Sequence, residues 1–545
     1  MLLIDELKKT IKGEVQNDEE TLRHYSTDAS IFTVKPQVVV FPKDVQDVKN
    51  LVSFVREHKE NTPGLSLTAR SAGSDMSGGP LTESIVVEFT RHFNHVKEIS
   101  DSRAVVEPGV FYRDLEKETV KQGLLLPSYP ASKLLATLGG MIANNSGGEK
   151  TLEYGKTNEY VEELKVVLAD GNEYTLKRLP KEELNQKFAQ EDFEGAFYKK
   201  VYELLENNYD LIKNARPKVS KNSAGYALWD VWDREYFDLT QLFVGSQGTL
   251  GLVTEAKLLL VKPKEHKRLA VLFLKDIGQL PDIINAVLPL EPEGLEAFDD
   301  NTLKLALRFF PNIARRIKGQ NIFSLALQFI PEFFVVLRML GLPKLVILVQ
   351  FAEDSDEEAE GKLAQLGTAL GSFPIQKRIL HKEKEGEKYW VIRRESFALL
   401  REHVKGKKTA PFIDDFIVDP DKLPEFLPRV YKILEEYNIH VTLAGHAGSG
   451  NFHIIPLMDL KKESERKKIP EVSNKVYDLI IEYGGSITAE HNDGLIRSPY
   501  LKKMYGEKVY ALFEEVKKIF DPQNIFNPGK KVYSSLEYAM AHIEH

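Results

Sequence analysis

Residues 136–148 read Ala136-Thr137-Leu138-Gly139-Gly140-Met141-Ile142-Ala143-Asn144-Asn145-Ser146-Gly147-Gly148, and this run of small residues decides how the fold is interpreted. Two other loops have the same character, at residues 69–79 and 245–251. Consecutive backbone N–H groups in such a loop form a concave site that suits a pyrophosphate. Each loop alone is equally compatible with an ordinary surface turn, but three of them in one region predict a domain that binds a large dinucleotide.

The spacing of these glycines differs from the two best-known nucleotide motifs. No G-x-G-x-x-G fingerprint follows the first expected strand with an acidic residue about 20 positions later, and no G-x-x-x-x-G-K-[ST] loop is present. Short β-branched runs alternate instead with helical patterns such as residues 45–57, which predicts mixed α+β layers. The expected strands are residues 38–40, 85–87, 104–106, 164–168 and 251–260.

The length of the chain predicts more than one domain, because 545 residues exceed what a single core usually holds. A change of pattern near Lys264 marks the expected boundary. We predict a helical lead-in at residues 1–35, a dinucleotide-binding domain at 36–263, a second α+β domain at 264–530 and a tail at 531–545. In the second domain, expected strands at residues 269–273 and 345–350 flank an insertion.

The insertion at residues 303–344 is basic and bears aromatic residues. Glu332 is its single acidic residue, and its basic residues are Lys304, Arg308, Arg315, Arg316, Lys318, Arg338 and Lys344. An amphipathic segment of this kind can lie on an anionic membrane surface. Packing on the body of the protein explains the pattern equally well, so peripheral membrane contact is a hypothesis.

Composition excludes several classes of function. The formal net charge of −8 argues against a nucleic-acid partner, because such partners need a dense basic surface. The absence of cysteine excludes disulfides, Cys-ligated iron–sulfur clusters and a thiol nucleophile. The N-terminus is acidic where a signal peptide would be basic, and no apolar run reaches the length of a membrane span. We therefore expect a cytoplasmic protein, with contact at the inner face of the membrane left open.

Metal-binding residue types gather near the end of the chain. Residues 445–453 read Gly445-His446-Ala447-Gly448-Ser449-Gly450-Asn451-Phe452-His453, between expected strands at 440–444 and 452–457. A hairpin at this place would bring His446 and His453 side by side. Each histidine alone is more often an ordinary loop residue, but two of them in one glycine-rich hairpin indicate a site.

A carboxylate and a third histidine follow after an expected helix at residues 472–483. The segment reads Thr488-Ala489-Glu490-His491-Asn492-Asp493-Gly494. With the two hairpin histidines, Glu490 could complete a site for a divalent cation that keeps open positions. His491 could be a fourth ligand, a general base or a supporting residue. Neighbouring side chains in an extended segment point to opposite faces, which favours Glu490 as ligand and His491 as base.

Taken together, these motifs resemble a known family, the flavin-dependent oxidoreductases of the vanillyl-alcohol oxidase type. Within that family the sequence is similar to the glycolate oxidase, D-lactate dehydrogenase and D-2-hydroxyglutarate dehydrogenase group. The resemblance extends from about residue 36 to residue 530. It is carried by the three glycine loops, the two metal motifs and residues 107–109, 126–128, 154–155, 225–226 and 520–530. The sequence departs from the family pattern at Ser449, where Asp is usual, and at Ala489 and Asn492, where Gly is usual.

The resemblance implies a two-lobed FAD-binding domain followed by an α+β substrate cap. It also implies that FAD is noncovalent, because the His in the first loop and the Cys in the cap that tether flavin in some relatives are both missing here. The residues that it assigns to FAD are Arg70, Ser71, Ala72, Gly73, Ser74, Asp75, Gly78, Gly79, Pro127, Ser128, Thr137, Gly139, Gly140, Ala143, Asn144, Ser146, Gly147, Gly248 and Asn527.

The resemblance further implies a reaction, the oxidation of a 2-hydroxy acid of the D-lactate, glycolate or D-2-hydroxyglutarate type by hydride transfer to flavin. A divalent metal (Zn, Mn or Fe) at His446, His453 and Glu490 would orient the substrate, with His491 as general base. Trp390-Val391-Ile392-Arg393 resembles the family's Trp-x-x-Arg, so Arg393 would bind the substrate carboxylate, with Arg497 as second choice. Pairing of Arg393 with a nearby carboxylate is the alternative.

Electrons would leave to a separate acceptor: a quinone, an electron-transfer flavoprotein, a cytochrome or an iron–sulfur subunit. Some large bacterial relatives carry an iron–sulfur module after the flavoprotein part, and we expect none here because the sequence has no cysteine. Two other functions stay open. One is a redox-neutral or lipid-substrate flavoenzyme of the same superfamily, and the other is a metallohydrolase that activates water.

Overall fold

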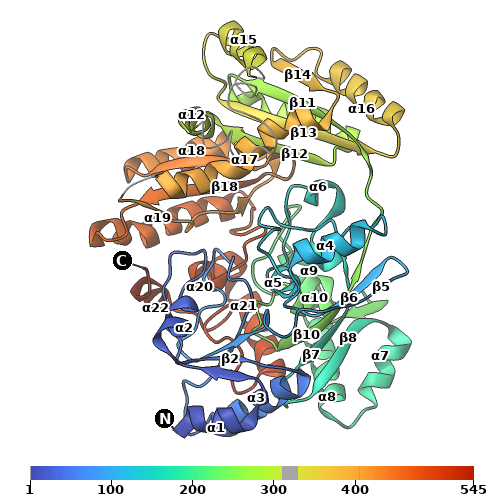
Figure 1. Cartoon of the computed structure of the whole chain (residues 1–545), viewed down its shortest axis with the longest axis vertical. Helices are drawn as coiled ribbons and strands as arrows, with labels where there is room; N and C mark the ends of the chain where they lie inside the picture. Colours follow the sequence, from blue (N-terminus) through green and yellow to red (C-terminus); the bar gives the residue numbers. More distant parts are fainter. Residues whose placement is uncertain (1, 310–328, 404–405, 545) are drawn as a thin grey trace.

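The structure is a computed structural model that describes residues 2–309, 329–403 and 406–544. Helices and strands form mixed layers around three sheets. Figure 1 shows the first two sheets in the lower part of the molecule, with the N-terminus, and the third sheet in the upper part. This arrangement confirms the predicted α+β class.

The first sheet has the strand order β1-β2-β4-β3. Its strands are β1 (Glu14–Gln16), β2 (Val38–Phe41), β3 (Leu67–Arg70) and β4 (Ile85–Glu88). β2 and β4 pair in parallel and are buried along their whole length, as continuous β-branched runs predict. Helix α3 (Val45–His58) begins where Asp44 accepts a hydrogen bond from the Asp47 N–H, and its apolar face packs on the sheet.

The lead-in is part of this first layer. It forms α1 (Leu2–Thr10), β1 and α2 (Glu19–His24), and β1 pairs antiparallel with β2. At the other edge β3 ends at Arg70, where the first glycine loop begins. The first glycine loop therefore starts directly at the end of a sheet strand, which fixes its position.

The second sheet has the order β5-β6-β10-β7-β8-β9. Its strands are β5 (Val96–Ser100), β6 (Arg103–Val106), β7 (Val161–Val167), β8 (Glu173–Pro180), β9 (Tyr236–Asp238) and β10 (Leu252–Leu259). The helices of this region are α4 (Tyr112–Val120), α5 (Leu138–Asn144), α6 (Thr151–Tyr154), α7 (Lys181–Phe188), α8 (Phe193–Asn207), α9 (Tyr209–Ala215) and α10 (Thr240–Phe243). The second glycine loop contains α5, and the third lies between α10 and β10.

The third sheet has the order β14-β11-β13-β12-β17-β18-β15, and β16 also pairs with β18. Its strands are β11 (His266–Leu274), β12 (Gly294–Asp299), β13 (Leu345–Glu353), β14 (Gln376–Leu380), β15 (Lys408–Thr409), β16 (Phe416–Ile417), β17 (His440–His446) and β18 (Asn451–Met458). β17 and β18 form the predicted hairpin, in which Ala444 lies opposite His453. The helices on this sheet are α11 (Leu280–Val287), α16 (Asp356–Ala369), α17 (Glu383–His403), α18 (Leu423–Glu436) and α19 (Glu463–Glu482).

After the third sheet the chain returns to the lower part of the molecule (Figure 1). It forms α20 (Gly494–Arg497), α21 (Leu501–Phe520) and α22 (Leu536–Ala541). The ring of Phe520 in α21 contacts the ring of Phe197 in α8, and Phe526 forms an isolated β-bridge with Leu67 of β3. The last part of the region predicted as the second domain thus packs in the core of the first two sheets.

The basic insertion is described at its two ends, as α12 (Asp300–Arg308) and α15 (Ile330–Met339), whereas residues 310–328 lie outside the described part. Figure 1 places α15 at the upper end of the molecule. In the described ranges, every helix is too short or too polar to cross a bilayer.

Candidate functional site

Asp75 gives the first glycine loop its shape. Its Oδ2 accepts hydrogen bonds from the Ser77 and Gly79 N–H groups and from the Ser77 hydroxyl, at 3.1, 2.8 and 2.7 Å. Its Oδ1 accepts from Asn144 Nδ2 at 2.9 Å, so the same carboxylate joins the first loop to the end of α5. Two loops that are far apart in sequence therefore lie together.

Gln247 and Asn527 fasten the three loops to one another. Gln247 Nε2 donates to Ser77 Oγ and Asn144 Oδ1 at 3.1 and 3.3 Å. Asn527 Nδ2 donates to the carbonyl oxygens of Gly79 and Gln247 at 3.0 and 2.7 Å. The loops thus form one rigid wall.

This wall borders a cavity of about 820 Å³. Most of the residues that the sequence assigned to FAD line it; the exceptions are Gly78, Pro127, Ser128 and Asn527. Asn527 acts from behind, through the two carbonyl bonds described above. The cavity is continuous with the histidine cluster, since His446, His453, Glu490 and His491 also line it.

The hydrogen bonds of the Arg70 guanidinium indicate whether the cavity suits an anionic cofactor. The side chain is 6% exposed and lines the cavity, and Nη2 donates to the Thr27 carbonyl at 2.8 Å. Nε and Nη1 find no hydrogen-bond partner among the described residues. A buried guanidinium that lines a cavity and has two donors without a hydrogen-bond partner among the described residues suits a nearby anion, and the pyrophosphate of a dinucleotide is such an anion. The donor set therefore fits FAD.

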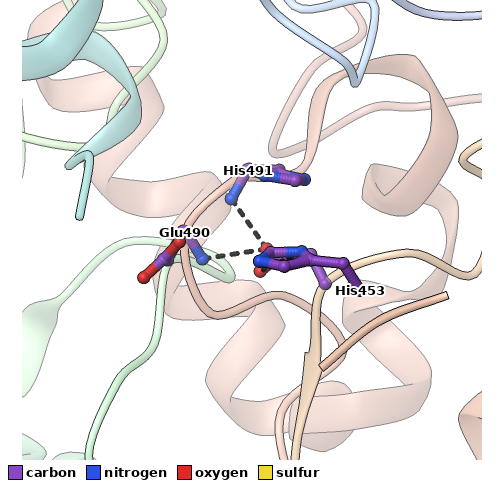
Figure 2. Close-up of side chains that lie close together, drawn as sticks. His453, Glu490 and His491 are labelled. Atoms are coloured by element: carbon purple, nitrogen blue, oxygen red, sulfur yellow. Dashed lines mark hydrogen bonds and ion pairs between the residues drawn. The ribbon is translucent and has the colours of Figure 1, made fainter. Parts of the chain in front are cut away.

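The β17–β18 hairpin places two imidazoles next to each other. The ring centroids of His446 and His453 are 5.4 Å apart, and both side chains are buried. His453 also stacks on His491, with a centroid distance of 4.9 Å and an interplanar angle of 17°. Figure 2 shows these two rings one above the other, with Glu490 and His491 leaving their loop in different directions.

Asp415 holds the loop that carries Glu490 and His491. Its Oδ2 accepts from the N–H groups of Ala489, Glu490 and His491 at 3.0, 2.8 and 2.7 Å. The hydroxyl of Thr488 donates to the same oxygen at 2.6 Å. One carboxylate thereby bends the backbone so that both neighbouring side chains reach the cavity.

Buried carboxylates face the Nδ1 atom of each histidine. His446 Nδ1 lies 2.5 Å from Glu296 Oε1. Asp414 faces the other two histidines. Its Oδ1 lies 3.2 Å from His453 Nδ1, and its Oδ2 lies 2.8 Å from His491 Nδ1. A proton on Nδ1 that faces a carboxylate leaves the Nε2 lone pair for a metal ion or a substrate proton.

The charges in this cluster stabilise one another. Burial alone would raise the pKa of Glu490, but His446 and Lys221 outweigh it and hold the pKa well below the usual value. Burial would lower the pKa of His491, but Asp415 and Asp414 raise it to about 9. Positive charge placed beside His491 would lower its pKa again.

The donor set fits a divalent cation. One ligand atom each from Asp415, His453, Glu490 and His491 lie within 4.8 Å of one another. His446 adjoins this group, because its Nε2 lies 3.3 Å from Glu490 Oε2. Oδ2 of Asp415 already accepts four hydrogen bonds, so the histidines and Glu490 are the better ligands. Imidazole and carboxylate suit Zn, Mn or Fe.

The two arginines suggested for the substrate occupy different places. Arg393 lines the cavity, and its Nε lies 2.7 Å from Glu296 Oε2. Arg497 is wholly buried and donates to the carbonyl oxygens of Asn492 and Asp414 at 3.1 and 2.6 Å. The structure therefore places Arg497 behind the histidine loop, outside the cavity lining. Arg394 lines the cavity and pairs with Glu149.

Sequence reasoning missed several residues that complete the site. Glu296, Asp414 and Lys221 are buried beside the proposed ligands, and Gln247 fastens the glycine loops. Asp414 is adjacent in sequence to Asp415, whose carboxylate holds the loop of Glu490 and His491. Glu296 lies in an ordinary strand pattern, and nothing local marks it.

Two families match the chain. Residues 36–177 match the family described as FAD binding domain. Residues 263–531 match the family described as FAD linked oxidases, C-terminal domain. Both agree with the resemblance drawn from the sequence motifs.

Curated relatives agree as well. A D-2-hydroxyglutarate dehydrogenase of Pseudomonas putida is 30% identical over 531 residues, which cover 95% of this chain and 50% of that protein. The chain thus spans about half the length of this relative and of the D-2-hydroxyglutarate dehydrogenases of Escherichia coli and Pantoea ananatis. The glycolate oxidase subunit GlcD of Bacillus subtilis is 27% identical over 520 residues, or 93% of this chain and 91% of that protein.

The fold also matches solved structures. The 4-ethylphenol oxidase from Gulosibacter chungangensis aligns with a TM-score of 0.68 and 17% identity over 98% of each chain. A likeness at this identity concerns the fold alone. It agrees with the predicted flavin-binding domain and following cap.

Proposed function

We propose that the chain is an FAD-dependent, metal-assisted dehydrogenase of a small 2-hydroxy acid, because it belongs to the FAD-linked oxidases. The substrate would be of the D-lactate, glycolate or D-2-hydroxyglutarate type, as in the relatives with those names. One observation carries the proposal: a single cavity joins the three glycine loops to His446, His453, Glu490 and His491. Flavin and substrate would therefore meet in one space.

Each group of the site has its own role in the proposed reaction. FAD accepts a hydride when bound, and a divalent cation supplies Lewis-acid polarisation of the substrate oxygens. His446, His453 and Glu490 would hold the cation. His491 takes the hydroxyl proton at Nε2, because Nδ1 faces Asp414. The substrate loses one proton and one hydride, two electrons in all, and becomes the 2-oxo acid.

Arg393 is the proposed partner of the substrate carboxylate. It lines the cavity, and Glu296 orients its guanidinium at 2.7 Å. A guanidinium in the cavity lining has the charge and the planar shape that suit a carboxylate. Arg497 would instead position the histidine loop through its two carbonyl contacts.

FAD would be held without a covalent bond. The first loop contains no histidine and the sequence contains no cysteine, so the usual tethering side chains are missing. The electrons would pass to a separate acceptor such as a quinone, a cytochrome, an electron-transfer flavoprotein or an iron–sulfur subunit. We propose a cytoplasmic location for the chain.

The test is anaerobic mixing of the purified, metal-analysed protein with D- and L-2-hydroxy acids while flavin absorbance is followed. We expect one enantiomer of one acid to bleach the flavin, and a chelator to abolish the bleaching. A yellow protein that no hydroxy acid bleaches would favour the redox-neutral or lipid-substrate alternative. A colourless protein that hydrolyses esters or amides would favour the metallohydrolase.

We also propose that the protein contacts an anionic membrane surface through α15. Its exposed apolar residues recur at helical spacing: Ile330, Phe333, Phe334 and Leu337 are 47%, 65%, 53% and 58% exposed. Glu332 on the same helix is engaged with Lys388 and Arg378. An apolar stripe without free acidic groups suits anionic lipid.

The double substitution Phe333→Ser with Phe334→Ser should reduce co-sedimentation with phosphatidylglycerol vesicles several-fold, because it removes the largest apolar side chains of the stripe. Val120→Ser with Tyr533→Ser removes exposed apolar side chains elsewhere and should change nothing. Equal sedimentation of the two double variants, or none by the unaltered protein, would contradict the membrane proposal.

A further inference from the structure

The two oxygens of the Glu490 carboxylate have different partners. Lys221 Nζ lies 2.6 Å from Oε1, whereas His446 Nε2 lies 3.3 Å from Oε2. The side chains of Lys221 and Glu490 are only 3% and 6% exposed. The buried ammonium group of Lys221 therefore already pairs with one of the two oxygens of Glu490, which is a proposed metal ligand.

Lys221 reaches Glu490 from a separate part of the molecule. It comes from the connection between α9 and η2 (Leu228–Asp230) and lines a second cavity of about 350 Å³, while Glu490 lines the large cavity. Lys221 and Glu490 thus line different cavities, and His446 lines the same cavity as Glu490.

The neighbouring lysine has another task. Lys156 Nζ donates to the carbonyl oxygens of Ala489 and Asn222 at 2.6 and 3.1 Å, and to the Ser223 hydroxyl. It fixes the backbone of the Glu490 loop and has no hydrogen bond or ion pair to the carboxylate among the contacts described. The ion pair to Glu490 belongs to Lys221.

Gly147 of the second glycine loop lies close to Glu490 Oε1. A Cβ atom at Gly147 would lie 3.1 Å from Glu490 Oε1 and 2.7 Å from Thr151 Oγ1. The missing side chain at Gly147 therefore leaves space for the carboxylate in the position where Oε1 pairs with Lys221 Nζ.

We propose that Lys221 is a positioning residue that acts as a built-in counterion of the metal site: it reserves Oε1 of Glu490, restricts that ligand to coordination through Oε2, and keeps the divalent cation exchangeable. This inference rests on the metal-assisted function proposed above. Beyond that function, Lys221 would control how tightly the site binds the cation.

The physical reason is competition between two cations for one buried carboxylate. Like charges a few ångströms apart in a buried site repel strongly, so the ammonium group opposes a dication on Oε2. Without Lys221, the buried carboxylate of Glu490 would lose one of its charged partners, and this would destabilise the folded protein. Binding of a dication would remove that cost, so the variant should bind cations more tightly.

The experiment compares Mn²⁺ binding by the FAD-loaded protein after chelator treatment, with free Mn²⁺ measured by EPR. Lys221→Met should lower the dissociation constant about tenfold or more. Mn²⁺ should also raise the melting temperature of this variant more than that of the unaltered protein, because the two effects are linked. Lys221→Arg keeps the charge and should bind Mn²⁺ as the unaltered protein does.

Lys517→Met is the matched control. Lys517 forms an equally buried pair with Asp521, at 2.5 Å and with side chains 1% and 0% exposed. Its loss should lower the melting temperature without changing Mn²⁺ affinity. If Lys221→Met does not fold, Lys221→Gln removes the same charge and keeps a hydrogen-bond donor, and the same tightening is expected.

Unchanged or weaker Mn²⁺ binding by the neutral Lys221 variants, beside measurable binding by the unaltered protein, would overturn the inference and leave the proposed function intact. Absence of binding in the unaltered protein would reveal failure of the metal-assisted function by itself. In that case, new binding by Lys221→Met would still support the counterion role, and no binding by either would overturn it.

Discussion

Replacement of His491 by alanine should slow flavin reduction about 10²- to 10⁴-fold, which is the usual contribution of a positioned general base. The ring lines the large cavity, and Asp414 lies 2.8 Å from its Nδ1. Without the imidazole, the substrate hydroxyl has no partner to take its proton. The loop itself should persist, because Asp415 holds it through backbone N–H groups that the substitution leaves in place.

Stopped-flow flavin absorbance checks this result in protein that retains full FAD and metal. Added imidazole should recover part of the lost rate, since it can enter the space that the side chain leaves. His440→Ala removes an exposed histidine at the start of β17 and should react normally. An unaltered rate of flavin reduction in His491→Ala would remove His491 from the mechanism.

Replacement of His446 by alanine should release the divalent cation. His446 Nε2 lies 3.3 Å from Glu490 Oε2, and Glu296 orients the ring at 2.5 Å. Loss of even an orienting partner of a metal ligand typically costs about 10- to 100-fold in metal affinity, so loss of the ligand should cost at least about 100-fold. Reduction of the flavin by the hydroxy acid should fall with it.

Metal content per protein, measured by elemental analysis after dialysis, reports the loss directly. FAD content should stay complete, because the glycine loops that line the flavin part of the cavity do not contact His446 in any described pair. Addition of excess Mn²⁺ should restore part of the activity by mass action. Full metal content together with full activity in His446→Ala would contradict the cation role of the hairpin.

The departures from the family pattern have local explanations in the structure. Asn492, where Gly is usual, has a φ of 65°, in the left-handed region that Gly adopts freely and Asn tolerates better than most residues. Its Nδ2 donates to the carbonyl oxygens of Gly245 and Asn144 at 2.9 and 3.2 Å. Ser449 donates its hydroxyl to the His446 carbonyl at 3.1 Å. Both side chains thus form hydrogen bonds to backbone carbonyl oxygens beside the cavity.

The sequence by itself determined the features that depend on short-range pattern. β-branched runs predicted β2, β4 and β7, and the glycine-rich segment between two strands predicted the β17–β18 hairpin. Adjacent residues in an extended segment predicted that Glu490 and His491 would leave the chain in different directions, as Figure 2 shows. These features follow from the period of the backbone and from turn chemistry, which involve neighbours in the chain.

Only the tertiary structure decided which charges meet. Glu296 reaches His446 across 150 positions, and Lys221 reaches Glu490 across 269. Arg497, a candidate for the substrate from sequence, lies buried behind the loop because its guanidinium holds two backbone carbonyl oxygens there. A buried charge must find its partner wherever folding brings one, and that choice depends on how sheets and loops pack, which no local pattern records.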